Sequence, residues 1–455
     1  MALATVFAVS IGFSLLRMPV QVSDSLEEIL AVQKQPSAWA AFETALLADR
    51  AHVRPLRTTQ TKILLDLSAG HYRLAYRGFH AALVLACLLL FVRALRVRTP
   101  PDLAAASFAL TVVMGMEAFR GGLQEAYPIN HFLEVSMLCL LTLNLAQARP
   151  SARVDLAAAL TFVLAVLTLE SGLLVWVVAA AAWGSGLRGI SWRGVAALTI
   201  LAAAYVLVRR FYLEVATPGL GERTSGYWLG ALDADEQRRR FLSQPFVFYT
   251  YNVVAAALSI LFSEPQGGTI VSVSSWQQGD VPPRVWLSIA SSFVTTALIV
   301  RASWRAQRGG DLRLLIVGSA VIVANAVFCY AYIKDEIMIV AGVFYAIAAF
   351  VAVRATLGEL AALPRAAAVS VIILLAATGS AWAMRSAGVH QVMRAQAFKE
   401  RNDWGLLPAT WKAAGKWPQD PAGQRLLLDL RRDALIVEAP NPQFEPRWAY
   451  RWWGE

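Results

Sequence analysis

Long apolar stretches separated by shorter polar loops constrain the fold of this 455-residue chain more than any other feature. A helix that crosses a bilayer needs about 20 predominantly apolar residues. Segments that approach or exceed this length lie at residues 2–16, 79–91, 103–119, 132–146, 156–183, 195–208, 285–300, 314–331, 338–353 and 366–383. The sequence therefore predicts an all-α fold, a polytopic transmembrane helical bundle.

The composition agrees with a membrane protein, because only 16% of the residues are charged and soluble domains carry about 25%. Many of the arginines behind the net charge of +10 lie in short clusters between apolar segments. Arginines in such places orient membrane helices, so we expect no nucleic-acid partner. The three cysteines, Cys87, Cys139 and Cys329, fall within apolar segments and are expected to pack helices rather than to form disulfides or a metal site.

Two segments need separate interpretation. Residues 156–183 are too long for one span and are interrupted by Leu169-Glu170-Ser171-Gly172, so we expect two short helices that meet at a polar turn. Counting both, the chain would cross the membrane about eleven times. Residues 246–262 are apolar but contain Tyr249, Tyr251 and Asn252, which favours an interfacial or re-entrant helix over a true crossing.

Arginine positions predict the topology, because cytoplasmic loops are enriched in Lys and Arg. Every second short loop is basic, which places a transmembrane domain at residues 1–384 with outer loops at 21–78, 120–130 and 209–284. Residues 385–455 then form an extracytoplasmic tail, which would pack against the outer loops or be partly disordered. The expected location is the cytoplasmic (inner) membrane, with polar chemistry on its periplasmic or extracellular face.

The first outer loop offers two kinds of site residue. Asp24 follows the first apolar segment and could act as a general base near the membrane surface, or it could simply begin a helix of the loop. His52, Arg54 and Arg57 follow in the same loop. Arginine recognises phosphate through a planar fork, although it also anchors proteins to lipid headgroups.

Three later segments add candidates on the same side. Glu125 and His131 lie in or next to the second outer loop, without the ligand spacing of a metal site. Glu170 is a charge in an apolar stretch, which is a functional hypothesis by default, although a surface turn would also explain it. Lys334 could meet a lipid phosphate or pair with Asp335 or Glu336 in a surface turn.

In their order along the chain, these features resemble the GT-C superfamily of membrane glycosyltransferases, especially the protein O-mannosyltransferases. Asp24 falls where that family has its catalytic acid, and His52-Val53-Arg54-Pro55-Leu56 is similar to its second element. Three further segments look like family motifs: Gly78-Phe79-His80-Ala81-Ala82, Gln124-Glu125-Ala126-Tyr127 and Leu169-Glu170-Ser171-Gly172. The family's last element is echoed only loosely at Lys334-Asp335-Glu336-Ile337-Met338, because the basic residue precedes the acids here.

The resemblance implies an inverting glycosyltransferase that uses a polyprenyl-phosphate-linked sugar and a protein, lipid or glycan acceptor. It implies that Asp24 deprotonates the acceptor, with Glu125 beside it. Donor phosphate would be bound and stabilised by residues of several loops, namely His52, Arg54, Arg57, Glu170, Arg209, Arg210 and Lys334. The resemblance specifies no certain cofactor and leaves a divalent cation possible.

Three other interpretations fit the same pattern. A lipid or solute transporter or flippase would use Glu170 and the outer arginines along a substrate path. An O-antigen ligase or polymerase would use a longer polyprenyl-linked donor. An inactive scaffold of the GT-C fold would keep the layout without the chemistry.

Overall fold

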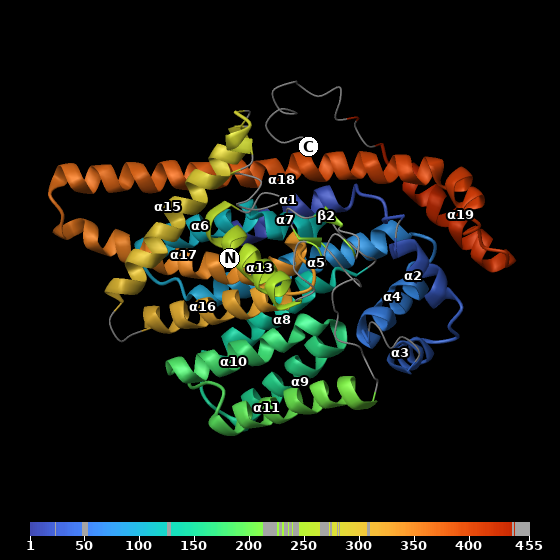
Figure 1. Cartoon of the computed structure of the whole chain (residues 1–455), viewed down its shortest axis with the longest axis horizontal. Coiled ribbons are helices and arrows are strands. Elements are labelled where there is room, and N and C mark those ends of the chain that lie inside the picture. The colour runs from blue at the N-terminus through green and yellow to red at the C-terminus, as the bar shows by residue number, and fades with distance from the viewer. Residues whose placement is uncertain are drawn as a thin grey trace.

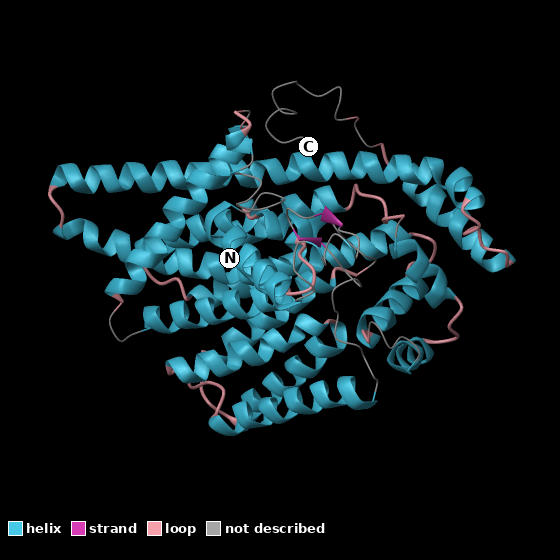
Figure 2. Cartoon of the chain, viewed as in Figure 1, coloured by secondary structure: helices cyan, strands magenta, loops and turns pink. Residues whose placement is uncertain are grey.

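A computed structural model describes residues 1–22, 24–47, 53–124, 129–212, 225–226, 230–231, 235, 239, 245–263, 273, 275–279, 281, 283–306, 310–438 and 441. The prediction of an all-helical protein is confirmed, as Figure 2 shows for the described residues. One short antiparallel pair joins β1 (Ser225–Gly226) to β2 (Gly230–Ala231).

Helices make up most of the described chain. In chain order they are α1 (Ala2–Leu15), α2 (Asp24–Gln33), α3 (Ala38–Leu47), α4 (Pro55–Leu67), α5 (Tyr72–Leu95), α6 (Pro100–Gly115), α7 (Glu117–Gln124), α8 (His131–Ala146), α9 (Ala152–Thr168), η1 (Glu170–Leu173), α10 (Leu174–Ser185), α11 (Trp192–Leu207), η2 (Val208–Tyr212), α13 (Pro245–Leu258), η3 (Ser259–Ser263), α15 (Pro283–Arg305), α16 (Gly310–Phe328), η4 (Asp335–Met338), α17 (Ile339–Glu359), η5 (Leu360–Ala362), α18 (Arg365–Ala413) and α19 (Pro421–Leu435).

The bundle has two polar ends, here named the α4 end and the Arg354 end. At the α4 end, the guanidinium of Arg77, near the start of α5, donates to the carbonyl oxygens of Met18 and Pro19, just after α1. At the Arg354 end, Arg354 of α17 forms ion pairs with Asp102 of α6 and Asp311 of α16. Consecutive helices such as α5 and α6, or α16 and α17, thus run in opposite directions between these two ends (Figure 1).

Six helices among the described residues are long and apolar enough to cross a membrane, or seven if the bent pair α6 and α7 is one span. They are Tyr72–Leu95, Trp192–Phe211, Pro283–Arg305, Gly310–Phe328, Asp335–Ala362 and Arg365–Ala413. The eleven expected crossings are therefore not confirmed. The shortfall has a physical reason, because α1 has 14 residues and α10 has 12, and a helix rises only about 1.5 Å per residue against a hydrocarbon core of about 30 Å.

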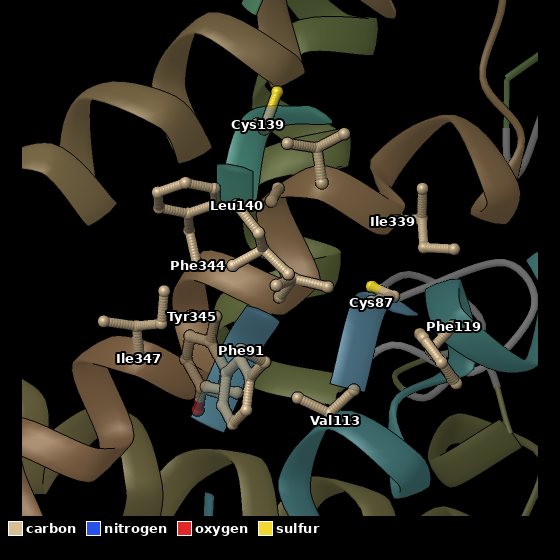
Figure 3. Close-up of a cluster of buried hydrophobic side chains, with 14 of the residues drawn as sticks. Cys87, Phe91, Val113, Phe119, Cys139, Leu140, Ile339, Phe344, Tyr345 and Ile347 are labelled. Atoms are coloured by element: carbon tan, nitrogen blue, oxygen red, sulfur yellow. The ribbon is translucent and has the colours of Figure 1, made fainter. Parts of the chain in front are cut away.

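The hydrophobic core lies between α5, α6, α8 and α17. Figure 3 shows Cys87 and Phe91 of α5, Cys139 of α8 and Phe344 of α17 in one apolar cluster. All three cysteines are buried and free. Helix α17 is the central element, because 94% of its most apolar window is buried inside the protein, so protein rather than lipid surrounds it.

Helix α18 carries the chain beyond the bundle. Its 49 residues span about 74 Å at 1.5 Å per residue, more than twice the thickness of a hydrocarbon core. In Figure 1 it runs along the upper edge of the molecule toward α19, on the side where α2, α3 and α4 lie. Its second half and α19 form a separate apolar cluster with the first loop, here named the outer cluster, whose members include Val20, Leu26, Ile29, Leu65, Tyr76, Trp404, Leu407, Leu427 and Leu430.

The segment 246–262 forms α13 and η3, which pack against α16 and α15 respectively. Asn252 is fully buried and its amide donates to the carbonyl oxygen of Tyr330 at 2.9 Å. The interpretation of this segment as an interfacial or re-entrant helix, rather than a true crossing, stays a prediction.

Candidate functional site

Helix α4 organises the polar side chains at its end of the bundle. It begins at Pro55, which suits the first turn of a helix because proline lacks the N–H that would be unpaired there. Three side chains at the start of α4 or on it each bind a carboxylate from a different element. Arg54 binds Glu170, Arg57 binds Glu28 and Gln60 binds Glu134. Arg54 and Gln60 therefore join the first loop to the bundle, and Arg57 joins two helices within that loop.

The first of these contacts joins three segments at one carboxylate. Arg54 donates from Nε and Nη2 to Oε2 of Glu170, at 3.1 and 2.9 Å. Arg209, in η2 just after α11, donates from Nη1 to Oε1 of Glu170 at 3.2 Å and to the hydroxyl of Tyr205 at 2.9 Å. Two guanidinium groups thus share one acid, and the Arg54–Glu170–Arg209 triad carries an excess of one positive charge.

The position of Glu170 follows from a tight reversal of the chain. Helix α9 ends at Thr168, and the 3-10 turn η1 starts at Glu170 before α10 continues from Leu174. A Cβ atom at Gly172 would overlap the backbone of Ala165, so only glycine allows η1 to fold against α9 this closely. The predicted pair of helices meeting at a polar turn is confirmed for these residues.

Glu170 remains ionised in this setting. Burial by itself would raise the pKa of Glu170, but the charges of Arg54 and Arg209 and the hydrogen bonds from Arg54 outweigh it and lower this pKa to about 2. Opposite charges and hydrogen bonds to the ionised form both act in this direction. The carboxylate is therefore suited to holding two guanidinium groups rather than to exchanging protons near neutral pH.

The second contact of α4 joins it to α2. Arg57 makes two contacts with the Glu28 carboxylate: Nε lies 3.2 Å from Oε1 and Nη2 lies 3.0 Å from Oε2. Burial raises the pKa of Glu28, and the charge and hydrogen bonds of Arg57 offset this only in part. Helix α2 begins at Asp24, one helical turn before Glu28, so this pair fixes the helix on which the predicted general base lies.

The third contact joins α4 to the start of α8. Gln60 donates from Nε2 to Oε1 of Glu134 at 2.6 Å. Asn130 caps α8 by accepting from the amide of Leu133, and His131 is buried as the first residue of the helix. The α8 terminus thus adds a buried carboxylate that contacts α4 through Gln60.

The remaining predicted site residues lie in different surroundings. Arg210 is exposed, and among the described side chains only Arg54 and Arg209 pair with Glu170. Lys334 forms an ion pair with Glu336 at 3.3 Å, in η4, which packs against α7. His52 and Glu125 lie outside the described residues, and for Asp24 the structure describes only the backbone.

Sequence reasoning missed Glu28, Gln60 and Glu134 as site residues. Glu134 carried a usable signal, since it is the one acid in the apolar sequence of α8, and a charge in such a segment is a functional hypothesis in the same way as Glu170. The sequence contained no signal that could have identified Gln60, because an amide side chain in a polar loop helix is ordinary. Its role depends on which element α4 packs against.

A cavity of about 380 Å³ lies at the Arg354 end, away from these residues, and its lining includes Arg301, Arg305, Asp311 and Glu359. Both arginines donate to the Glu359 carboxylate. Charged groups on three helices therefore meet there too, but in pairs that tie α15 to α17 and α16 to α17.

No group of three or more His, Cys, Asp or Glu side chains that could hold a metal ion occurs within the part of the chain that the structure describes. Comparisons with protein-family models, with curated proteins and with solved structures find no match for this chain. The chemistry of the site must therefore be argued from its own residues.

Proposed function

We propose that this protein is an inverting glycosyltransferase of GT-C type, which moves a sugar from a polyprenyl-phosphate-linked donor to an acceptor at the outer face of the membrane. The observation that carries the proposal is the convergence of Arg54 and Arg209 on Glu170, at the end of the bundle where α2 begins with Asp24. A phosphate site and a carboxylate base are the two parts that this reaction needs.

The triad would bind the donor phosphate. Two guanidinium groups and one ionised carboxylate leave one positive charge, which matches the single negative charge of a sugar phosphodiester. Glu170 would hold both arginines in place before the donor arrives, so that little reorganisation is needed as charge develops on the leaving phosphate. Arg57, already paired with Glu28, would position α2 rather than bind phosphate.

Asp24 would act as the general base. It would take the proton from the acceptor hydroxyl while the acceptor oxygen attacks the anomeric carbon from the face opposite the phosphate. The bond from that carbon to the phosphate oxygen breaks, and polyprenyl phosphate leaves with its charge on the triad. One displacement inverts the anomeric configuration.

The architecture supports a lipid-linked donor. The triad lies where α9, η1 and α11 meet the first loop, and α11 belongs to a candidate span of which only 11% is buried inside the protein. A polyprenyl chain could therefore approach the site from the bilayer along an exposed helix. Eleven crossings, with the short helices α1, α8, α9 and α10 included, belong to this proposal.

The test is binding and release by the full chain in lipid nanodiscs. Wild-type protein should bind polyprenyl phosphate, and Arg54→Leu and Arg209→Leu should each weaken that binding about tenfold or more, as loss of a charged hydrogen bond predicts. Incubation with polyprenyl-phosphate-mannose or polyprenyl-phosphate-glucose should release polyprenyl phosphate. Unchanged binding in both variants would refute the phosphate site, and movement of the lipid across vesicles without release would indicate a transporter.

A further inference from the structure

The pair of Glu134 and Gln60 contains two buried oxygens for which the described part of the chain offers no hydrogen-bond partner. Glu134 is only 8% exposed, and Gln60 Nε2 donates to its Oε1 at 2.6 Å. Glu134 Oε2 and Gln60 Oε1 are buried and have no hydrogen-bond partner among the residues that the structure describes. Because more than about 90% of buried polar groups in proteins are paired, two such atoms on one pair of side chains need an explanation.

The neighbouring side chains of α4 are already engaged elsewhere. Arg54 binds Glu170, and Arg57 binds Glu28. The hydroxyl of Thr61 donates to the carbonyl oxygen of Arg57 at 2.9 Å. The missing partner must therefore come from outside this set. An amide oxygen, and a carboxylate oxygen in its ionised form, only accept hydrogen bonds. The partner that satisfies both Gln60 Oε1 and ionised Glu134 is therefore a hydrogen-bond donor such as a hydroxyl group.

We propose that Glu134 and Gln60 bind hydroxyl groups on the ring of the donated sugar. The inference rests on the proposed function, in which the Arg54–Glu170–Arg209 triad holds the phosphate. Arg54 caps the start of α4 and Gln60 lies on that helix six residues later, which corresponds to an axial rise of about 9 Å. A sugar bonded directly to that phosphate would lie between the two positions, with its hydroxyl groups toward the unpaired oxygens.

This arrangement determines sugar specificity as well as affinity. A carboxylate and an amide that lose their partners in a buried site pay the full cost of desolvation. Sites built to bind a substrate hydroxyl therefore discriminate strongly against analogues that lack it. The pair selects donors with free hydroxyl groups at the bound positions and disfavours their deoxy analogues.

The experiment compares three lipids on the full chain in nanodiscs: polyprenyl phosphate, polyprenyl-phosphate-mannose and polyprenyl-phosphate-glucose. Wild-type protein should bind at least one sugar-bearing lipid more tightly than polyprenyl phosphate. Glu134→Gln and Gln60→Leu should each remove about tenfold or more of that preference and leave polyprenyl phosphate binding unchanged. Gln147→Leu, at the far end of α8, serves as the matched control and should bind all three lipids as the wild type does.

The outcomes separate this inference from the proposed function. If neither variant changes the sugar preference, or if the wild type has none, the two oxygens bind water only and the inference is overturned. If Arg54→Leu still weakens binding of all three lipids, the phosphate site stands by itself. If neither Arg54→Leu nor Arg209→Leu changes the binding of any of the three lipids, the proposed function itself is refuted. If Glu134→Gln does not fold, the inference is tested with Gln60→Leu alone, because Gln60 is only half-buried, on a helix of the first loop.

Discussion

The guanidinium of Arg54 contacts the carboxylate of Glu170 across 116 positions of sequence, with Nη2 and Oε2 at 2.9 Å. This contact ties the first loop to the turn between α9 and α10. Arg209 adds a third segment at the same carboxylate. One acid therefore holds together three parts of the chain at the place where we propose that a lipid phosphate binds.

Replacing Glu170 by Gln should raise the donor KM about tenfold or more, because Arg54 and Arg209 lose the charge that orients them. Glu359→Gln is a matched control, since Glu359 also lies between two arginines, Arg301 and Arg305, at the opposite end of the bundle. Steady-state transfer kinetics of both variants provide the measurement. An unchanged donor KM in Glu170→Gln would leave Glu170 with a purely structural role.

Asp24→Asn should abolish sugar transfer and leave expression and lipid binding intact, because an amide cannot accept the acceptor's proton. General acid–base catalysis contributes about 10²–10⁴-fold in rate, which sets the expected loss. Turnover and polyprenyl phosphate binding are measured on the same preparation. Full activity of this variant would remove Asp24 from the mechanism.

Acid should weaken the contribution of Glu170 to stability. Its pKa is lowered from 4.5 to about 2 in the folded protein, so the stabilisation is present above pH 4.5 and is lost as pH falls from 4.5 toward 2. The difference in unfolding free energy between wild type and Glu170→Gln should shrink over this interval. Glu28, whose pKa is raised, contributes in the opposite sense, so Glu28→Gln should not reproduce the loss.

Gly172→Ala should destabilise the protein by about 1–3 kcal/mol, because the added methyl group forces η1 away from α9. The control is Gly184→Ala in α10, where a Cβ atom meets nothing within 4 Å. Thermal unfolding of both variants in detergent is the measurement. Equal melting temperatures for Gly172→Ala and wild type would show that η1 moves freely.

Trp404→Ala should cost about 3–5 kcal/mol, the usual range for removing a large buried aromatic side chain. Trp404 is fully buried in the outer cluster, and its Nε1 donates to the carbonyl oxygen of Val20 at 2.6 Å. Trp39→Ala removes the same side chain from a site that is 70% exposed and should cost little. Proteolysis near α2 should increase in Trp404→Ala only.

Much of the fold could be predicted from local pattern. Runs of apolar residues identify membrane helices because lipid offers no partner for an exposed backbone N–H or C=O group. The polar interruption at Glu170 was visible for the same reason. The number of crossings was harder to predict, because hydropathy does not show where a helix such as α1 or α10 stops short of a full span.

The sequence by itself determined that this chain is helical and apolar enough for a membrane, and it singled out candidate charges such as Arg54, Glu170 and Arg209. Only the tertiary structure decided that these three meet, that Arg57 belongs to Glu28, and that Gln60 reaches Glu134. The physical reason is that side-chain partners depend on which helices pack together, and helix packing depends on the shapes of whole faces rather than on any short segment.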